Sequence, residues 1–121
     1  MLKHTILILG ILMLIVGVSV FGPVPIVTED EALVVTGVVE SVHEGTSFDV
    51  VIRLVDQSRR YYINRGLERG LSMHDLEDKL VGKEAILKYP KYWTPLDWNG
   101  STVHISKVEV GDEVIFNELK V

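Results

Sequence analysis

Two short stretches of this chain bring arginine and aromatic side chains together, and this combination could bind a ligand. Residues 59–65, "RRYYINR", interleave arginine with tyrosine, and residues 86–100, "ILKYPKYWTPLDWNG", hold four of the nine aromatic residues. A guanidinium pairs with anions and stacks on flat rings, while tyrosine and tryptophan offer apolar area with a polar edge. The sequence therefore predicts a surface that contacts a protein or an anionic or glycan ligand. The predicted contact residues are Arg60, Tyr62, Arg65, Tyr92, Trp93 and Trp98.

A structural role is the alternative for the same residues. Trp93 and Trp98 could fold over an open end of a small core instead of facing a ligand. The arginines of residues 59–69 could pair with acids on neighbouring strands, such as Asp49 and Asp56. The sequence leaves both interpretations open.

No residue set in the sequence has the spacing of a catalytic or metal-binding motif. His43, His74 and His104 match no zinc-ligand pattern, and no glycine-rich phosphate loop is present. The chain has no cysteine, which removes thiolate metal sites and disulfides. We therefore predict no catalytic residue, no metal and no cofactor. A hydrolase built on a β-barrel is the enzymatic alternative.

The charge distribution argues against nucleic acid as the partner. The chain carries 12 Lys+Arg and 17 Asp+Glu, and only Lys3 precedes residue 28, so residues 28–121 have a net charge of −6. A nucleic-acid binder needs a broad basic surface that neutralises phosphates. A protein or an anionic glycan fits this composition better.

The first 27 residues are the most apolar part of the chain. No charged residue lies between Thr5 and Thr28, and residues 6–21, "ILILGILMLIVGVSVF", are almost wholly aliphatic. As a helix, residues 5–22 would reach roughly 27 Å, close to the hydrocarbon thickness of a bilayer. We predict an uncleaved transmembrane helix here. A cleaved secretory signal and a buried core helix are the alternatives.

The basic residues near this span predict its orientation. Lys3 precedes the span, whereas the next basic residue after it is Arg53. The positive-inside bias then predicts a single-pass membrane protein with a cytoplasmic N-terminus and an extracytoplasmic C-terminal domain. After signal cleavage, the same domain would be secreted or periplasmic. The predicted organisation is an anchor at 1–27, an acidic tether at 28–33 and a β-rich domain at 34–121.

Alternating apolar residues predict most of the elements that position the arginines and rings. Residues 33–42 and 48–55 alternate with β-branched enrichment, and "HEGTS" between them predicts a hairpin loop. A third strand at 59–65 places Tyr61 on one face and Tyr62 on the other. Further strands are predicted at 84–89, 102–110 and 113–119, with a bulge where the apolar parity slips between residues 105 and 108.

One short helix is predicted between the third and fourth strands. Met73, Leu76, Leu80 and Val81 fall on a single stripe at helical spacing. Ser72 is a natural N-cap, and a glycine at position 82 suits a left-handed C-terminal cap.

This order of elements, with Gly37 as a bend in the first strand, resembles the OB-fold, a five-stranded Greek-key barrel. The resemblance covers residues 33–110 and implies that strands two and three, with the loop joining strands four and five, form the ligand face. The predicted fold class is mainly β with one short helix. In full, a transmembrane helix precedes an OB-like barrel of five to six strands with a C-terminal hairpin arm. An SH3-like barrel and an open α+β sheet are the alternatives.

Because a superfold carries no function by itself, the function must follow from the candidate residues. We predict a membrane-anchored, non-catalytic binding module that uses its aromatic and arginine-rich face. A structural or accessory subunit of a membrane protein complex is the alternative.

Overall fold

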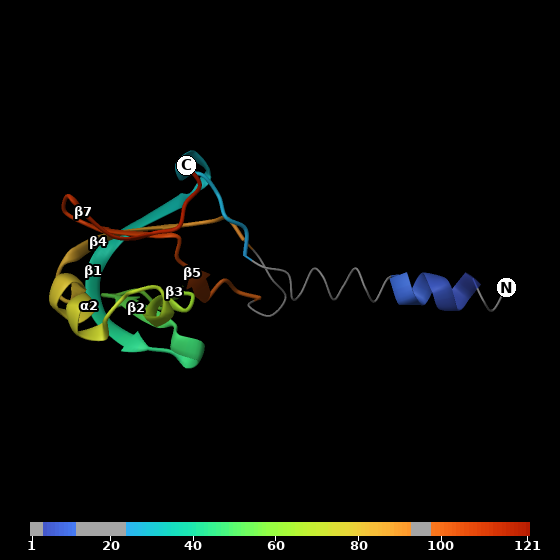
Figure 1. The fold of residues 1–121 in the computed structure, drawn as a ribbon, viewed down its shortest axis with the longest axis horizontal. Helices are drawn as coiled ribbons and strands as arrows, with labels where there is room; N and C mark the ends of the chain where they lie inside the picture. Colours follow the sequence, from blue (N-terminus) through green and yellow to red (C-terminus); the bar gives the residue numbers. More distant parts are fainter. Residues whose placement is uncertain (1–3, 12–23, 93–97) are drawn as a thin grey trace.

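The computed structural model describes residues 4–11, 24–92 and 98–121 of the chain (Figure 1). Among these residues the β-rich part begins with β1, and one α-helix, α2, lies between the third and fourth strands. The prediction of a mainly β fold with one short helix in the domain is confirmed. The elements are β1 (Leu33–Glu44), β2 (Val50–Leu54), β3 (Arg60–Ile63), α2 (Met73–Leu80), β4 (Glu84–Tyr89), β5 (Thr102–His104), β6 (Lys107–Val110) and β7 (Glu113–Asn117), with 3-10 turns η1 (Glu29–Glu31), η2 (Thr46–Phe48) and η3 (Gly66–Glu68).

The transmembrane prediction is wrong for the part of the chain that the structure describes. The N-terminal helical residues are 4–11, which at 1.5 Å per residue rise roughly 12 Å, well short of the ~30 Å hydrocarbon core of a bilayer. Among the described residues, no helix is long and apolar enough to cross a membrane. The single-pass placement with a cytoplasmic N-terminus depended on that helix and is wrong for the same reason. Residues 12–22 of the predicted span lie outside the described residues.

The strands form one mixed seven-stranded sheet in the order β5-β3-β2-β1-β4-β6-β7. The long strand β1 belongs to both halves of this sheet, because residues 33–38 pair with β4 and residues 39–44 pair with β2. Figure 1 shows the result: β4 and β7 lie along one part of β1, and β2, β3 and β5 lie along the other. The sheet therefore folds over on itself around β1.

The bend in β1 lies at a bulge beside Glu40, three residues after the predicted position. Pairing with β2 shifts register between Val39 and Ser41, whereas Gly37 stays in regular register opposite Ala85. Gly37 serves a different purpose, since a Cβ there would lie 3.1 Å from Leu54 Cδ1. The bulge moves the apolar parity by one residue, so Val39 is buried while Val34, on the same predicted face as Val42, is exposed.

The predicted strand at 102–110 is split into β5 and β6, which lie near opposite ends of the sheet order. β5 pairs in parallel with β3, and β6 pairs with β4. Between them, the Ile105 amide donates to Tyr62 O and the Ser106 amide donates to Lys88 O, both at 2.8 Å. The predicted break in parity is therefore the point where the chain passes from one half of the folded sheet to the other. The predicted hairpin that ends the chain is confirmed as β6–β7.

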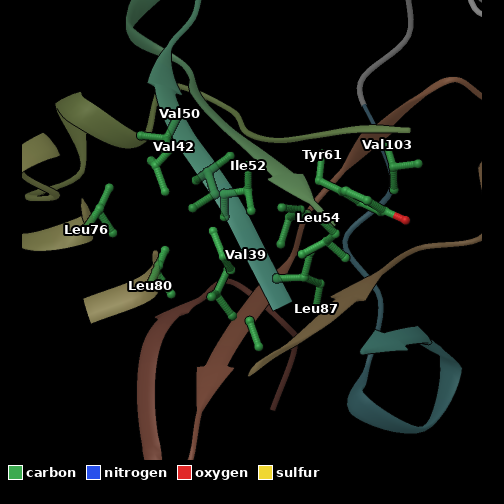
Figure 2. Packing of buried hydrophobic residues seen from close by; sticks show 14 residues of the cluster. Val39, Val42, Val50, Ile52, Leu54, Tyr61, Leu76, Leu80, Leu87 and Val103 are labelled. Atoms are coloured by element: carbon green, nitrogen blue, oxygen red, sulfur yellow. The ribbon is translucent and has the colours of Figure 1, made fainter. Parts of the chain in front are cut away.

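The core lies between the two halves of the sheet and is covered at one end by α2. Val50, Ile52 and Leu54 of β2 are fully buried. Figure 2 shows Leu76 and Leu80 of α2 facing the side of the core that β1 and β2 form. The helix begins after Ser72 and is followed by a glycine at position 82 with a positive φ of 80°, as its sequence predicts.

Tyr61 is a core residue with a satisfied hydroxyl. Its side chain is buried in the cluster of Figure 2, and the hydroxyl donates a hydrogen bond of 2.7 Å to Gln57 Oε1. Burial raises the pKa of the Tyr61 phenol above its usual range. Tyr61 therefore belongs to the core, and alternation along β3 sends the next residue to the opposite face, as the sequence predicts.

The acidic segment before β1 is attached to the sheet by ion pairs. Glu29 of η1 pairs with Lys88 of β4 and, at 3.1 Å, with Lys107 of β6. The hydrogen bonds from these lysines lower the pKa of the Glu29 carboxyl. Lys107 also pairs with Glu109 at 2.7 Å, so these two lysines are already neutralised.

Candidate functional site

The candidate site is the outer face of the β1–β2–β3–β5 half of the sheet, on the side away from the core. Cross-strand register joins His43 to Val51, Val51 to Tyr62, and Tyr62 to His104. Paired residues share one face of a sheet, so these four side chains form a row across four strands. We call this surface, with the arginines described next, the outer β2–β3 face.

A second row on the same face carries the positive charge. Ser41 pairs with Arg53, and Arg60 pairs with Thr102. The β2–β3 register runs from Val50 to Ile52 opposite residues 63 to 61, and one further step puts Arg53 beside Arg60. Neighbouring strands lie about 4.8 Å apart. Two guanidinium-bearing side chains therefore stand on adjacent strands of one face.

The side chains of this face are packed together rather than splayed into solvent. Val51 lies outside the core cluster, yet only 3% of it is exposed. Because its register partners are His43 and Tyr62, the covering atoms belong to side chains of the outer β2–β3 face. The tyrosine and the arginines therefore have a local scaffold that limits their movement.

Gly45 leaves the space that the Arg60 guanidinium occupies. A Cβ built at Gly45 would lie 3.2 Å from Arg60 Nη2, 3.0 Å from Val51 Cγ2 and 3.3 Å from Asp49 Cβ. The long side chain of Arg60 therefore lies across β2 and ends against the β1–β2 turn. Asp49 is engaged elsewhere, since its Oδ1 accepts the backbone N–H of Arg65 at 2.8 Å.

The arginines of residues 53–69 differ in their partners. Arg65 pairs with Glu68 at 3.1 Å, and Arg69 pairs with Glu118 at 2.5 Å. Neither of these acids is one of the predicted partners. Within the part of the chain that the structure describes, Arg53 and Arg60 have no carboxylate at ion-pair distance, although both side chains are half-buried. Pairing with acids of the same chain therefore accounts for Arg65 and Arg69 but not for Arg53 and Arg60.

One edge of the outer β2–β3 face is held by a chain of polar contacts. His104 Nε2 donates to Glu118 Oε1 at 2.6 Å, and Arg69 contacts the other carboxylate oxygen. The His104 ring meets the Tyr62 ring edge-on, with centroids 5.4 Å apart. Its other nitrogen, Nδ1, is buried and has no hydrogen-bond partner among the described residues. His104 is therefore fixed between Glu118 and Tyr62, and it limits where the tyrosine ring can lie.

The ion-pair cluster makes stability depend on pH through Glu118. Burial alone would raise the pKa of Glu118, but the hydrogen bonds from His104 and Arg69 outweigh it and lower the pKa below its usual range. A carboxyl whose pKa is lowered by folding stabilises the protein above its unfolded pKa, about 4.3 for glutamate. That stabilisation is lost as the pH falls through the folded value.

Glu118→Gln is therefore expected to lower the free energy of unfolding near neutral pH and to do so less at acidic pH. Urea denaturation across the range below about pH 6 measures the difference between variant and wild type. The exposed Glu77→Gln on α2 serves as a matched control that loses a carboxylate outside the cluster. A difference that stays constant as the pH is lowered would show that the Glu118 charge does not contribute.

The structure brings Arg60 and Tyr62 together and distributes the other predicted contact residues around them. Arg65 follows β3 with a left-handed backbone and pairs with Glu68. Tyr92 follows β4 and is exposed. Trp98 is 75% exposed in the turn before β5, three residues before Ser101, whose carbonyl accepts the Arg60 amide at 2.7 Å. Trp93 lies outside the described residues.

Three residues of the outer β2–β3 face were missed at the level of sequence. Arg53 shares the parity of Val51 in a clearly alternating strand, so its outward direction was available from the sequence. His43 and His104 join Tyr62 only through pairings between distant strands. No local signal identifies such neighbours.

Among the residues described, no group of three or more His, Asp or Glu side chains is arranged to hold a metal ion. No protein-family model, curated protein or solved structure matches the chain. The function therefore has to follow from the chemistry of the outer β2–β3 face.

Proposed function

We propose that this chain is a small OB-like binding module whose outer β2–β3 face binds an anionic ligand without catalysing a reaction. Four features support the OB-like fold. They are the strand β1 shared by both halves of the sheet, the parallel β3–β5 pair, the helix between β3 and β4, and the continuous segment 102–110 that contacts both halves.

The observation that carries the proposal is the pair of arginines beside Tyr62. Arg53 and Arg60 are half-buried on adjacent strands, and neither has a carboxylate at ion-pair distance within the described part of the chain. Removing a cation from water without an opposite charge costs free energy, and an incoming anion offsets that cost. The guanidinium fork matches the oxygens of carboxylates, sulfates and phosphates.

The Tyr62 ring supplies a second contact for the ligand, beside the arginines. Its ring lies one row away from the arginines and is held edge-on against His104. A ring that is already ordered loses little conformational entropy when a flat group of the ligand stacks on it. A ligand that combines an oxyanion with a flat group would therefore contact both rows.

Phenyl phosphate is a suitable probe because it carries one oxyanion and one flat ring. We expect that adding it to the ¹⁵N-labelled full chain shifts the amide resonances of Arg53, Arg60 and Tyr62 most strongly. The amides of α2, which covers one end of the core and contributes no residue to the outer β2–β3 face, serve as the internal control. Shifts that concentrate on α2 or β7, or that are evenly spread, would contradict the proposed site.

A further inference from the structure

We infer that the outer β2–β3 face accepts one compact anionic group attached to a flat ring, and that it excludes extended polyanions. This inference rests on the proposed function and narrows its ligand class. The size of the cationic area is the first reason. Among the described residues, the positive charge on this face that has no carboxylate at ion-pair distance comes from two side chains, Arg53 and Arg60, which begin on adjacent strands. Two guanidinium groups offer enough donors for the oxygens of a single phosphate, sulfate or carboxylate.

A carboxylate limits this cationic area at the end nearest the β1–β2 turn. Asp49 lies close to the Arg60 guanidinium, since both Asp49 Cβ and Arg60 Nη2 are within 3.3 Å of a Cβ position at Gly45. A polymer that continued past Arg60 in this direction would bring its next negative group toward the Asp49 carboxylate. Like charges at such separations repel.

A second carboxylate limits the opposite side of the face. Glu118 lies beyond His104, at the end of the row that contains Tyr62. Its bonds to His104 and Arg69 hold it in place and keep it ionised at neutral pH. Arg69 does not extend the cationic area, because its charge is already paired with Glu118. The cationic area is therefore enclosed by acids on both sides.

The Tyr62 ring offers the ring of the ligand a surface on which to stack. Tyr62 is two residues from Arg60 along β3, a separation of roughly 6.6 Å. An anion at the arginines and a ring against Tyr62 can therefore belong to one small molecule. Ser41 and Thr102 flank the arginines in the same row, so these two positions add no charge to it. This layout matches a flat ring that carries one anionic substituent, such as an aryl phosphate or an aryl carboxylate.

The test compares probes that differ in one property each, using the full chain and isothermal titration. Phenyl phosphate and benzoate carry a ring with one anion and distinguish a phosphate ester from a carboxylate. Inorganic phosphate lacks the ring, and tripolyphosphate and long-chain polyphosphate extend the anion. We expect one of the two ring probes to bind about tenfold or more tightly than inorganic phosphate, because stacking on one aromatic side chain is worth that much. Polyphosphate affinity, expressed per phosphate group, should not rise with chain length.

Variants separate this inference from the proposed function. Arg53→Ala and Arg60→Ala should each weaken the ring probe, whereas Arg59→Ala removes the same charge beside the Tyr61 hydroxyl and should not. If affinity per phosphate rises with chain length and falls in Arg60→Ala, the one-anion inference is overturned while the binding face stands. If neither ring probe binds, or if binding is the same in Arg60→Ala as in wild type, the proposed function itself is overturned.

Discussion

Leu80→Ala is expected to lower the free energy of unfolding by about 2–5 kcal/mol, the usual cost of removing a fully buried leucine side chain. Leu80 lies in the last turn of α2, has no exposed surface and faces the core beside Val39 (Figure 2). The side chains around it come from a helix and from a β-sheet that is fixed by backbone hydrogen bonds. They have little freedom to close the cavity, so the loss in the free energy of unfolding should exceed the lower limit of about 2 kcal/mol.

The neighbouring Val81→Ala is the matched control for this prediction. Helical spacing assigns Leu80 and Val81 to one apolar stripe, but the structure buries the first completely and leaves 41% of the second exposed. The helix ends at Leu80, and Val81 is already extended, which turns its side chain outward. We expect a loss of about 0.5 kcal/mol or less for Val81→Ala. Urea denaturation followed by circular dichroism measures both variants, and equal losses would contradict the position of α2.

The elements of the fold were predictable wherever one periodicity continued without interruption. Alternation along β2 and β3 separates Ile52 and Tyr61, which are buried, from Arg53 and Tyr62, which face outward. The helix is marked by Ser72 and by the glycine that follows it. In each case a local rule and the final packing agree, so reasoning from residue types alone finds the element and its inner face.

Prediction failed where the outcome depends on contacts between distant residues. The bulge beside Glu40 reverses which valines of β1 are buried, and it is set by simultaneous pairing of β1 with β2 and β4. The apolar N-terminal stretch has the composition of a membrane span, yet among the described residues no helix fits that role.

The candidate site also contains residues that a local rule brings together and residues that only long-range contacts bring together. Arg60 and Tyr62 are two residues apart on one strand, so their shared face follows from alternation. The contact between Glu118 and Arg69 joins residues 49 positions apart, and no spacing rule brings them together. The loop aromatics were chosen for their residue type alone. Their part in binding stays a prediction, with Trp98 exposed in the turn before β5 and Trp93 outside the described residues.

The double variant Arg60→Ala, Tyr62→Ala is expected to lose most of the binding of phenyl phosphate. Hydrogen bonds to a charged group contribute about 1.5–3 kcal/mol, and a stacked ring contributes about 1–3 kcal/mol. Because 1.4 kcal/mol corresponds to a factor of ten in affinity, removal of both should weaken binding by at least about tenfold. Tyr62 also covers Val51, so a loss of stability on the order of 1 kcal/mol is expected as well.

Two single variants show whether the loss comes from the site or from the fold. Tyr62→Phe keeps the ring against His104 and should retain most of the affinity. Arg59→Ala removes an arginine next to Arg60 in sequence but on the other side of the strand, near the Tyr61 hydroxyl. It should bind the probe as wild type does. A double variant that fails to fold would assign the two side chains a structural role.

The most direct test of the outer β2–β3 face as a binding surface is the dissociation constant of phenyl phosphate for the wild-type full chain and for Arg60→Ala, Tyr62→Ala in the same buffer. Circular dichroism of both samples verifies that they are folded. We expect measurable binding by the wild type and a dissociation constant at least about tenfold higher in the double variant. Equal affinities in two folded proteins, or binding by neither, would contradict the assignment.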